Sequence, residues 1–534
     1  MRQATDRRSS AGALCPGIAL LVVLLAATTT DATSGRRPNI VFLFTDDHAV
    51  QATGAYGSKI NSTPNIDRIA ERGMRFDRAY VTNSICGPSR ATILTGTHSH
   101  INGFYLNSFE GFDGTQPTFP KMLQEAGYQT VMIGKWHLGS DPTGFDHWDV
   151  LIDVGGQGFY YDANFGSPRG ESPSRGYVGE VITDKALAWL EEDRDPDRPF
   201  LLMVQHKAPH RNFTPGPREI AEWDDAEKIP EPPTLFDDFE GRARVRRETR
   251  MQLSEHIHKA DVKYGPSPYE DEEITALWEK AFGPGNRAYD ADPPEGRERT
   301  RWIYQRYIKS YLGAVASTDR EIGRILDYLE SSGLDRDTLV VYSSDQGFFL
   351  GEHGWFDKRW MDEESARIPL LAQWPGHIAP GSRSGALVQN LDFAQTFLDV
   401  AGVEAHPRMQ GRSLRPLLEG EEPPEWRDAI YYHYYEFPGF HAVAKHYGVR
   451  TDRYKLIHYY QAGEWELFDL ERDPDELQSV YEDPAYAQIR AALEERLTAL
   501  RKEYAVPEQD AAPTWFQARV GDGFDRLLLW FMGF

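Results

Sequence analysis

Short apolar runs without alternation recur along the chain and are separated by segments whose apolar residues have helical spacing. Runs of this length are typical of strands that are buried on both faces of a sheet. The apolar runs lie at 39–44, 129–133, 200–204 and 338–342, and the helical spacing at 63–72, 118–126 and 300–331. This alternation of strands and helices predicts an α/β fold with a large, mixed and mostly parallel β-sheet flanked by helices.

Two regions depart from this alternation. Residues 215–298 are rich in charge and proline, which favours a surface insertion with little regular structure. After residue 420, aromatic and β-branched segments predict an antiparallel sheet, and a last amphipathic segment predicts a terminal helix. The sheet segments are 429–435, 454–460 and 465–469, and the helical segment is 486–503. We therefore predict a large domain at 35–420 and a smaller C-terminal α+β subdomain at 421–534.

The N-terminus has the features of a secretory signal. Arg7 and Arg8 supply positive charge, an apolar run spans 17–27, and small residues continue to Ser34. This pattern predicts a signal peptide and leader at 1–34. The protein would then be periplasmic or secreted in a bacterium, and secreted or lysosomal in a eukaryote. A retained membrane anchor is the alternative, although the run is short for a bilayer span and no later stretch is long and apolar enough.

The charge balance and the cysteines narrow the choice of function. The formal net charge is −24 with a pI of about 5.1, so nucleic acid is not expected as a partner. An anionic substrate would need a local cationic pocket or a metal. Of the two cysteines, Cys15 lies in the predicted signal, which leaves Cys86 alone in the mature chain. An unpaired thiol in an exported protein is a candidate for reaction or modification.

Acidic residues follow two of the predicted buried strands. Asp46 and Asp47 come directly after the first strand, and Asp345 and Gln346 follow the strand at 338–342. Sites in open α/β sheets form at the carboxyl ends of strands. Carboxylates there without an equal number of cations need a positive partner, and these oxygen donors suit Ca²⁺ or Mg²⁺. A helix cap or turn is the alternative for any single aspartate.

Two longer runs are specific enough to indicate a family. They are Cys86-Gly87-Pro88-Ser89-Arg90-Ala91-Thr92-Ile93-Leu94-Thr95-Gly96 and Gly134-Lys135-Trp136-His137-Leu138-Gly139. The chain resembles the type I sulfatases through both runs and both acidic pairs, over residues 37–475. The resemblance implies an alkaline phosphatase-like fold, a catalytic domain at 35–420 and a bound divalent cation. It also implies that a formylglycine-generating enzyme or sulfatase maturase oxidises Cys86 to formylglycine (3-oxoalanine).

The resemblance also implies roles for single residues. One hydroxyl of the hydrated aldehyde would attack the sulfur of a sulfate ester, and the other would expel sulfate. The matching residues are Asp46, Asp47, Asp345 and Gln346 as metal ligands, Arg90 and Lys135 as groups that hold the hydroxyls, His137 as a group that aids sulfate release, His206 as general acid, and Lys358 as the sulfate-binding lysine. Lys135 and His206 would also contact substrate. A structural role for His206 and a solvated Lys358 are the alternatives. Lys207 and Arg359 are expected either at the surface or directly behind the residues that contact substrate.

The segment 431–450 is dense in aromatic, histidine and charged residues. We expect Glu436, His441, His446 and Arg450 to line one wall of the substrate pocket, with ordinary aromatic pairing on an edge strand as the alternative. The chain looks similar to sulfatases of the N-acetylglucosamine-6-sulfatase type, which implies a sulfated sugar of glycosaminoglycan origin. Iduronate-type, heparan N-sulfate and marine-polysaccharide sulfatases remain alternatives.

The sequence thus predicts a sulfuric ester hydrolase. Two other classes stay open at this point. A phosphonate or phosphate monoester hydrolase of the same superfamily would share the formylglycine and much of the metal site. A catalytically silent relative that binds carbohydrate is the other, and the presence of Cys86, Lys135, His206 and Lys358 argues against it.

Overall fold

A mixed sheet of ten strands forms the centre of the part of the chain that the computed structural model describes, residues 37–107 and 111–510. From one edge to the other the strands are β13 (Ser382–Ser384), β2 (Met74–Phe76), β12 (Leu370–Gln373), β9 (Thr338–Ser344), β1 (Asn39–Asp46), β8 (Phe200–Pro209), β4 (Gln129–Gly134), β5 (His147–Leu151), β6 (Asn164–Ser167) and β7 (Gly170–Pro173). The strands from β9 to β5 are parallel, and β12 and β6 join them antiparallel. The predicted mixed, mostly parallel sheet is confirmed.

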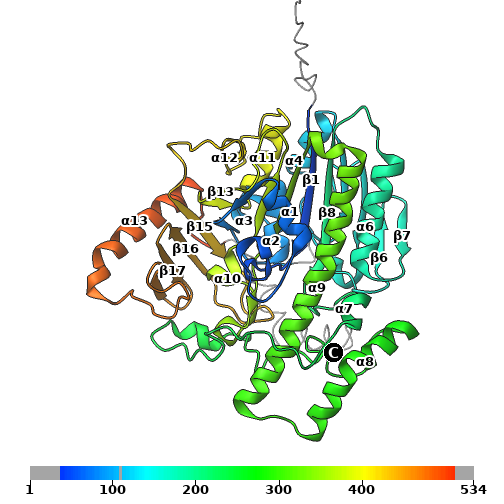
Figure 1. Cartoon of the computed structure of the whole chain (residues 1–534). Coiled ribbons are helices and arrows are strands. Elements are labelled where there is room, and N and C mark those ends of the chain that lie inside the picture. The colour runs from blue at the N-terminus through cyan, green and yellow to red at the C-terminus, as the bar shows by residue number, and fades with distance from the viewer. Residues whose placement is uncertain (1–36, 108–110, 511–534) are drawn as a thin grey trace, which may run out of the picture. The chain divides into compact units, whose positions relative to one another are not determined.

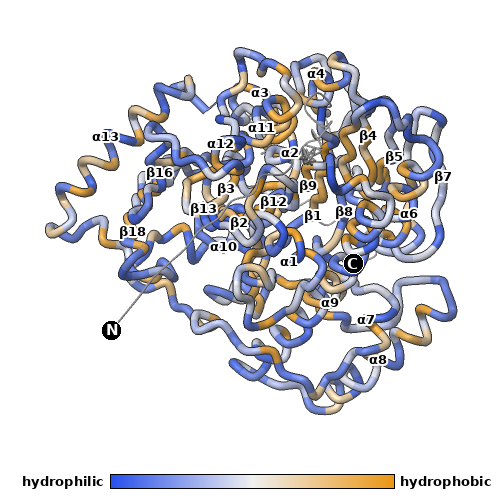
Figure 2. The backbone as a smooth tube through the Cα atoms, turned by 45° about the horizontal axis from the view of Figure 1, so that its top comes forward, coloured by the Kyte–Doolittle hydropathy of each residue, from blue (hydrophilic) through white to orange (hydrophobic). Residues whose placement is uncertain are grey.

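Helices cover both faces of this sheet, as Figure 1 shows. Alternate residues of β1 enter two different cores: Ile40 and Phe42 enter one, and Val41 and Leu43 enter the other. This follows from the two-residue period of a strand. The first core is closed by α2 (Cys86–Thr95), α4 (Phe119–Glu125) and α11 (Asp392–Val400), and the second by α1 (Pro64–Glu71), α6 (Val178–Ala188) and α9 (Gly296–Ser332). The hydrophobic strands at the centre are visible in Figure 2.

Smaller elements complete the body of the molecule. The helices expected at 63–72, 118–126 and 300–331 are confirmed as α1, α4 and α9. Two short strand pairs are β3 (Ala79–Tyr80) with β14 (Val388–Gln389), and β10 (Phe349–Leu350) with β11 (Phe356–Asp357). The remaining short helices are α3 (Ser99–Asn102), α5 (Asp153–Gly156), α7 (Pro217–Ala221), α10 (Glu363–Ala366) and α12 (Arg415–Leu418).

A separate four-stranded antiparallel sheet follows toward the C-terminus. Its strands, in order, are β15 (Ala429–Tyr434), β16 (His446–Thr451), β17 (Tyr454–Tyr459) and β18 (Glu464–Asp469). Helix α13 (Ala487–Glu503) packs on it through Leu493, Leu497 and Leu500, which share one face because they are spaced by three or four residues. The predicted antiparallel sheet and terminal helix are confirmed.

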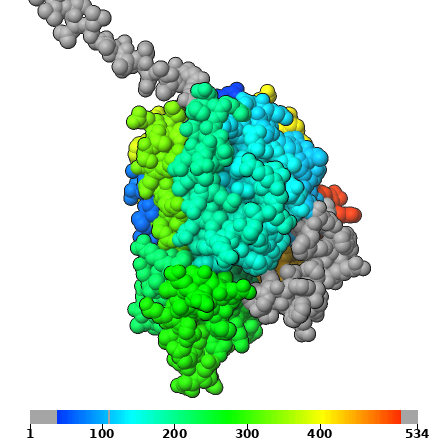
Figure 3. Space-filling view, turned by 90° about the vertical axis from the view of Figure 1, so that its right-hand side faces the viewer, coloured from blue at the N-terminus to red at the C-terminus, as the bar shows by residue number. Residues whose placement is uncertain are grey.

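The region 215–298 is more regular than we expected. It contains the 20-residue helix α8 (Glu272–Ala291), so the expectation of little regular structure is wrong. The side chain of Asp271 caps this helix by accepting from the backbone N–H of Ile274 at 3.0 Å, and Ile274, Trp278 and Phe282 form its buried stripe. The surrounding charge concealed that spacing. Figure 3 shows α8 and the start of α9, in green, at one end of the visible face.

Two of the expectations stay predictions, namely the signal peptide and the boundary between the two domains. The predicted signal at 1–34 and Cys15 lie outside the described residues. Contacts place residues 37–107 and 111–510 in one unit, so the boundary between 420 and 421 stays a prediction. Within 37–107 and 111–510, no helix combines the length and apolarity needed to cross a bilayer.

Candidate active site

Three aspartates meet where β1 and β9 end. The two strands are parallel neighbours along their whole length, so the residues that follow them reach the same edge of the sheet. Asp46, Asp47 and Asp345 are buried there, and their carboxylate oxygens lie within 4.8 Å of one another. The backbone N–H of Asp47 also donates to Oδ1 of Asp345 at 3.0 Å. The structure therefore brings these predicted metal ligands together.

The turn after β1 is strained and is held by a helix on one face of the sheet. Asp47 has a φ of 71°, a left-handed conformation that costs free energy in a residue other than glycine. The hydroxyl of Tyr311 on α9 donates to the carbonyl oxygen of Asp47 at 2.6 Å and accepts from the N–H of Ala49 at 2.8 Å. These two hydrogen bonds fix the direction in which the Asp47 carboxylate points.

Cys86 lies at the first position of α2, beside these carboxylates. Its side chain is 1% exposed, and the Gln346 amide nitrogen lies 3.5 Å from its Sγ. The backbone N–H of Gly87 donates to Oδ1 of Asn107 at 2.9 Å, and a Cβ on Gly87 would lie 2.6 Å from the Phe104 ring. Glycine is therefore needed for this close approach. The N-terminus of α2 is held in place by its packing.

Each of the three carboxylates is paired with a cation from another element. Arg90 lies 2.9 Å from Oδ2 of Asp345, Lys358 lies 2.7 Å from Oδ2 of Asp47, and Lys135 pairs with Asp46. Burial raises the pKa of Asp47 to about 6, with Lys358 opposing the rise. Cations that could meet an anionic substrate are thus present within an acidic protein, each paired with a carboxylate.

This pairing corrects one premise from the sequence. We expected the carboxylates to outnumber nearby cations, but three cations face three carboxylates. The case for a metal therefore depends on the donor set. Oδ1 of Asp46 and Oε1 of Gln346 are buried and accept no hydrogen bond from any residue that the structure describes. The amide nitrogen of Gln346 faces Asp47 and Cys86, and a half-turn of the amide would place its oxygen there. These hard oxygen donors fit Ca²⁺ or Mg²⁺.

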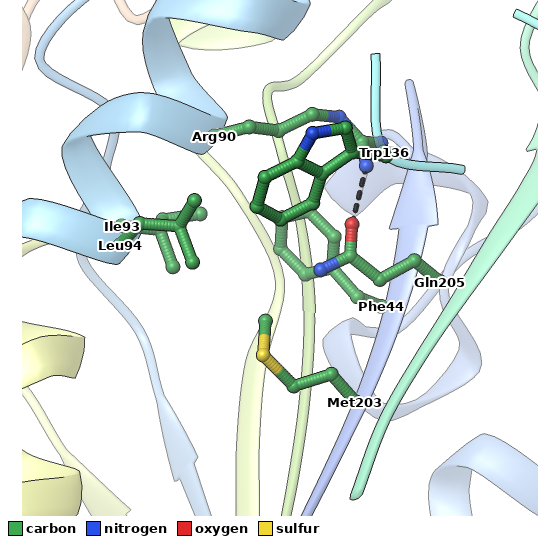
Figure 4. A pocket seen from close by; sticks show the side chains of 7 residues that line it. All are labelled: Phe44, Arg90, Ile93, Leu94, Trp136, Met203 and Gln205. Carbon is green, nitrogen blue, oxygen red and sulfur yellow. Dashed lines mark hydrogen bonds between the residues drawn. The ribbon is translucent and has the colours of Figure 1, made fainter. Parts of the chain in front are cut away.

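Arg90 is fixed from several sides, and Figure 4 shows its hydrogen bond to Gln205 with Phe44 nearby. Its Nη1 donates to Oε1 of Gln205 at 2.5 Å and to the carbonyl oxygen of Lys135 at 2.8 Å. Its guanidinium also lies 5.3 Å from the centre of the Phe44 ring. Arg90 therefore joins α2 to the central strands β1, β4 and β8, and it holds its charge next to Asp345.

His137 and Lys207 are buried close to the same charges. Burial and the nearby Lys135 lower the pKa of His137 well below its usual value, and Nε2 of His137 lies 3.0 Å from the amide of Gln157. Burial and Lys135 lower the pKa of Lys207 to about 7, while Asp46 opposes this. The burial of Lys207 excludes a surface position and fits the other expectation, a place behind the residues that contact substrate.

The structure brings His210, and not His206, to the group around Cys86. Three atoms lie within 4.8 Å of one another: a ring nitrogen of His210, Sγ of Cys86 and a carboxylate oxygen of Asp46. Nε2 of His210 is also 3.9 Å from Asp47. His206 is fully buried, and neither of its ring nitrogens has a partner among the residues described. Burial alone lowers its pKa to about 4. The cluster of three carboxylates is thus surrounded by a cysteine, an arginine, two lysines and a histidine.

Comparison with known proteins shows the family to which the chain belongs. The sequence profile described as Sulfatase matches residues 38–403, and the profile described as N-sulphoglucosamine sulphohydrolase, C-terminal, matches 351–503. The chain belongs to the sulfatase family. It is a sulfuric ester hydrolase, and the predicted alkaline phosphatase-like fold is confirmed.

Individual relatives agree with the family. An N-acetylglucosamine-6-O-sulfatase of Bacteroides thetaiotaomicron is 45% identical, covering 90% of this chain and 89% of that protein. Human N-acetylglucosamine-6-sulfatase is 28% identical, covering 76% of this chain and 68% of the human protein. A solved structure in complex with its substrate D-glucosamine-2-N,6-O-disulfate has a TM-score of 0.87 at 45% identity, covering 90% of this chain and all of that chain. The resemblance to the N-acetylglucosamine-6-sulfatase type is confirmed.

A second charged group of this sulfatase borders Lys358. It consists of Asp357, Arg359, Glu436 and His441, named here the Arg359 cluster. Arg359 donates to Asp357 at 3.1 Å and to Glu436 at 3.2 Å, and Nε2 of His441 lies 3.2 Å from Asp357. Asp357 and Arg359 have φ values of 78° and 92°, and such strain is common at functional sites. The predicted Glu436 and His441 are thus joined to the site through the residues on either side of Lys358.

His446 and Arg450 have partners in the protein interior instead. His446 lies on β16 with its ring stacked 5.3 Å from Trp360 and 5.5 Å from Tyr432. Arg450 pairs with Glu363 at 3.2 Å, and its guanidinium lies over the ring of Tyr80. Both residues were expected in the pocket wall, but they belong to a buried strand. Aromatic contacts hold His446, as the alternative expected, but β16 is an inner strand of the sheet rather than an edge, and Arg450 is held by an ion pair.

The buried His446 leads to a prediction about stability. Burial lowers its pKa to about 4, while an unfolded chain has the usual value near 6.5. The unfolded chain therefore takes up a proton first, so this contribution to stability is complete above about pH 6.5 and is lost as the pH falls toward 4. We expect His446 alone to lower the unfolding free energy by about 1.4 kcal/mol per pH unit over that range.

Urea unfolding of the parent and of His446→Phe, repeated at several pH values between neutral and mildly acidic, measures this contribution. The phenylalanine keeps the stacking on Trp360 but does not titrate. The variant should lose less stability than the parent on acidification. Equal losses in the two proteins would show that His446 does not titrate as its burial requires.

Three residues of the site were not assigned from the sequence, namely His210, Asp357 and Arg359. The apolar run at 200–204 suggested that the strand ends before His206, whereas β8 continues to Pro209. The residue at the carboxyl end is therefore His210, which fits the rule that sites form at strand ends. Asp357 and Arg359 flank the predicted Lys358, but nothing in the sequence indicated that their backbone is left-handed.

Proposed function

We propose that this sulfatase removes the 6-O-sulfate of glucosamine-type sugars, such as N-acetylglucosamine 6-sulfate, by means of a formylglycine derived from Cys86. A relative of 45% identity is named N-acetylglucosamine-6-O-sulfatase, and a solved neighbour of equal identity binds D-glucosamine-2-N,6-O-disulfate. We also propose that residues 1–34 direct export and that a formylglycine-generating enzyme or maturase acts on the chain. Sequence features alone support these last two points.

The observation that carries the proposal is the position of Cys86. Its sulfur lies within 4.8 Å of an Asp46 oxygen and a His210 nitrogen, among three buried cations. Burial raises the pKa of the Cys86 thiol to about 12, with Asp46 adding to the rise. An unmodified thiol would therefore be neutral and a weak nucleophile at neutral pH. This favours conversion of Cys86 to the aldehyde, whose hydrate would supply the attacking hydroxyl and then release sulfate by reforming the carbonyl.

The remaining residues bind and orient. Lys135 and Lys358 carry the charges that hold the sulfate oxygens, and Arg90 fixes the position of residue 86 through α2. Burial and Lys135 hold the pKa of His210 well below its usual value, so it can give a proton to the leaving sugar oxygen only when Nε2, which faces the carboxylates, has taken up a proton in the substrate complex. We propose His210 for this role because its Nδ1 donates to the carbonyl oxygen of Arg211 at 2.9 Å. That hydrogen bond fixes which ring nitrogen is available.

Asp46, Asp47, Asp345 and Gln346 are proposed to hold Ca²⁺, or Mg²⁺ in its place. The ion would neutralise charge on the sulfate oxygens and lower the pKa of the attacking hydroxyl. Two unpartnered buried oxygens in this group support the assignment. The cation is also expected to replace part of the positive charge that the lysines give to Asp46 and Asp47, which would leave those lysines available to substrate.

Calcium is therefore expected to stabilise the folded protein. At a free Ca²⁺ concentration of about 100 times its dissociation constant, the unfolding free energy should rise by about 2.7 kcal/mol. Asp345→Asn should lose most of this gain, because it removes a ligand charge. Asp335→Asn, at an aspartate outside the carboxylate group, is the control that should keep it. Thermal unfolding with and without chelator measures the gain, and an equal response of both variants would contradict the assignment.

The Arg359 cluster is proposed to recognise the hydroxyl groups of the sugar. Arg359 and His441 can donate hydrogen bonds, and Asp357 and Glu436 can accept them. The cluster continues from the proposed sulfate-binding Lys358, so a sugar with its sulfate at Lys358 would have its ring beside these groups. His446 and Arg450 are not included, because both have interior partners.

A desulfation screen tests the function. The substrates are N-acetylglucosamine 6-sulfate, D-glucosamine-2-N,6-O-disulfate, a 2-O-sulfated uronic acid, an aryl sulfate and the matching aryl phosphate, with Cys86→Ala as control. We expect the highest kcat/KM on the 6-O-sulfated glucosamines. Preference for the aryl phosphate would favour a phosphate ester hydrolase instead, and preference for the uronic acid would contradict the proposed sugar.

A further inference from the structure

A cavity of about 130 Å³, apart from the group around Cys86, lies against the C-terminal sheet. Its wall is formed by His433, Tyr435, Tyr447, Tyr460 and Arg501, together with residues 506–510. It shares no lining residue with the group around Cys86. A cavity of this size has room for more than a single water molecule, and its wall carries polar groups beside a larger apolar surface. It is therefore a place where a small polar ligand could be held.

His433, a residue of the cavity wall, has one ring nitrogen without a hydrogen-bond partner in the described part of the chain. The side chain is 6% exposed, and its Nδ1 is bonded to the hydroxyl of Tyr431 at 2.9 Å. Its Nε2, on the other side of the ring, has no partner among the residues that the structure describes. The ring itself is held by stacking on Tyr435 with centroids 3.7 Å apart. A buried nitrogen without a hydrogen bond is costly and calls for an explanation, and a ligand in the cavity would provide one.

The rest of the wall has the chemistry of a sugar-binding site. The rings of Tyr447 and Tyr460 lie 5.5 Å apart at 25° and offer aromatic surface with polar hydroxyl groups. Asp510 is already bonded to Lys445 at 2.6 Å and to the hydroxyl of Tyr460 at 3.0 Å. The guanidinium of Arg501 lies 4.2 Å from the centre of the Tyr447 ring, and one of its N–H groups donates to the carbonyl oxygen of Pro507 at 3.4 Å. Within the described part of the chain, Arg501 has no ion pair. It is therefore available to an acidic group of a ligand.

We propose that this cavity is a second carbohydrate-binding site that takes an acidic pyranose unit, one bearing a carboxylate or a sulfate group. Tyr447 and Tyr460 contact the ring, His433 hydrogen-bonds a hydroxyl, and Arg501 binds the acidic group. The site is separate from the one in which sulfate is cleaved.

The strand β15 relates the cavity to the active site. Along the end of β15 and the two residues that follow it, side chains alternate in direction: His433 and Tyr435 line the cavity, whereas Tyr434 and Glu436 face Arg359. The end of this one strand thus contributes to both places. We infer that the acidic unit belongs to the same oligosaccharide chain whose terminal glucosamine is desulfated, a point that rests on the proposed function.

Binding of a heparin-derived tetrasaccharide, which contains sulfated glucosamine and uronic acid, tests the proposal. Calorimetry in the Cys86→Ala background avoids turnover. Arg501→Gln and Tyr460→Leu should each raise the Kd about tenfold, the effect of losing one hydrogen bond to a charged group or one stacking surface. Arg490→Gln is the matched control: Arg490 lies on the same helix α13 and stacks 4.9 Å over Tyr481, outside the cavity. It should leave the Kd unchanged.

Measurements of turnover test the second site separately from the proposed sulfatase function. With Cys86 intact, Arg501→Gln should hydrolyse N-acetylglucosamine 6-sulfate with the kcat/KM of the parent, because the monosaccharide does not reach the cavity. An unchanged tetrasaccharide Kd in both cavity variants would overturn the second site, and so would an equal loss of monosaccharide turnover in Arg501→Gln. If the parent failed to desulfate the monosaccharide while the Kd still depended on Arg501, the proposed function would fail and the second site would stand.

Discussion

Replacing Cys86 with alanine should lower kcat on N-acetylglucosamine 6-sulfate by more than about 10⁴-fold, in the range found when a catalytic nucleophile is removed. Alanine keeps the first position of α2 but cannot be converted to an aldehyde. The three cations and the carboxylates around it remain, so the variant should still bind the sulfated sugar. Single-turnover measurements with excess enzyme, together with calorimetric binding, separate these two effects.

The second cysteine of the chain supplies a control for this substitution. Cys15 lies in the predicted signal, and Cys15→Ala should keep the parent kcat. If the Cys86→Ala protein retained an appreciable part of the parent activity, residue 86 would not be the nucleophile. Another group near Asp46 would then have to perform the attack.

Exchanging the two histidines of the run 205–210 for leucine should give opposite results. His210→Leu is expected to lower kcat by about 10²–10⁴-fold, the usual contribution of a positioned proton-transfer group. His206→Leu should keep kcat and raise the free energy of unfolding, because it removes two buried ring nitrogens that have no partner within the described chain. Steady-state kinetics and urea unfolding of both variants measure these effects.

An aryl sulfate with a good leaving group refines this comparison. Such a leaving group needs little protonation, so His210→Leu should lose much less activity on it than on the sugar sulfate. Equal losses on the two substrates would mean that His210 acts in another step. Loss of activity in His206→Leu alone would restore the role first expected for His206.

Much of the fold was predictable because the main elements follow local patterns. β1 and β9 each contain an uninterrupted apolar run and are buried along their whole length, and the spacing in α9 matches a single long helix. Helix α8 was not predicted, because the stripe of Ile274, Trp278 and Phe282 is embedded in a region dominated by charge and proline. Its burial depends on packing against other parts of the chain.

The site was predictable only where sequence position determines spatial position. Asp46 and Asp345 meet because each follows one of two parallel neighbouring strands. The choice between His206 and His210 depended on where β8 ends. The positions of apolar residues do not show reliably where a strand ends. Arg450 and Glu436 both lie in a charged, aromatic segment, but only the fold shows that Arg450 pairs with Glu363 and Glu436 with Arg359.

The mass of residue 86 tests the central claim most directly. Trypsin releases it in the peptide Ala79–Arg90. In active enzyme from a host that has a formylglycine-generating enzyme, this peptide should be about 18 Da lighter than its sequence requires, the difference between a thiol and an aldehyde. The lighter fraction should also rise in proportion to specific activity across preparations. A fully active preparation in which the peptide has the unmodified thiol mass would contradict the mechanism.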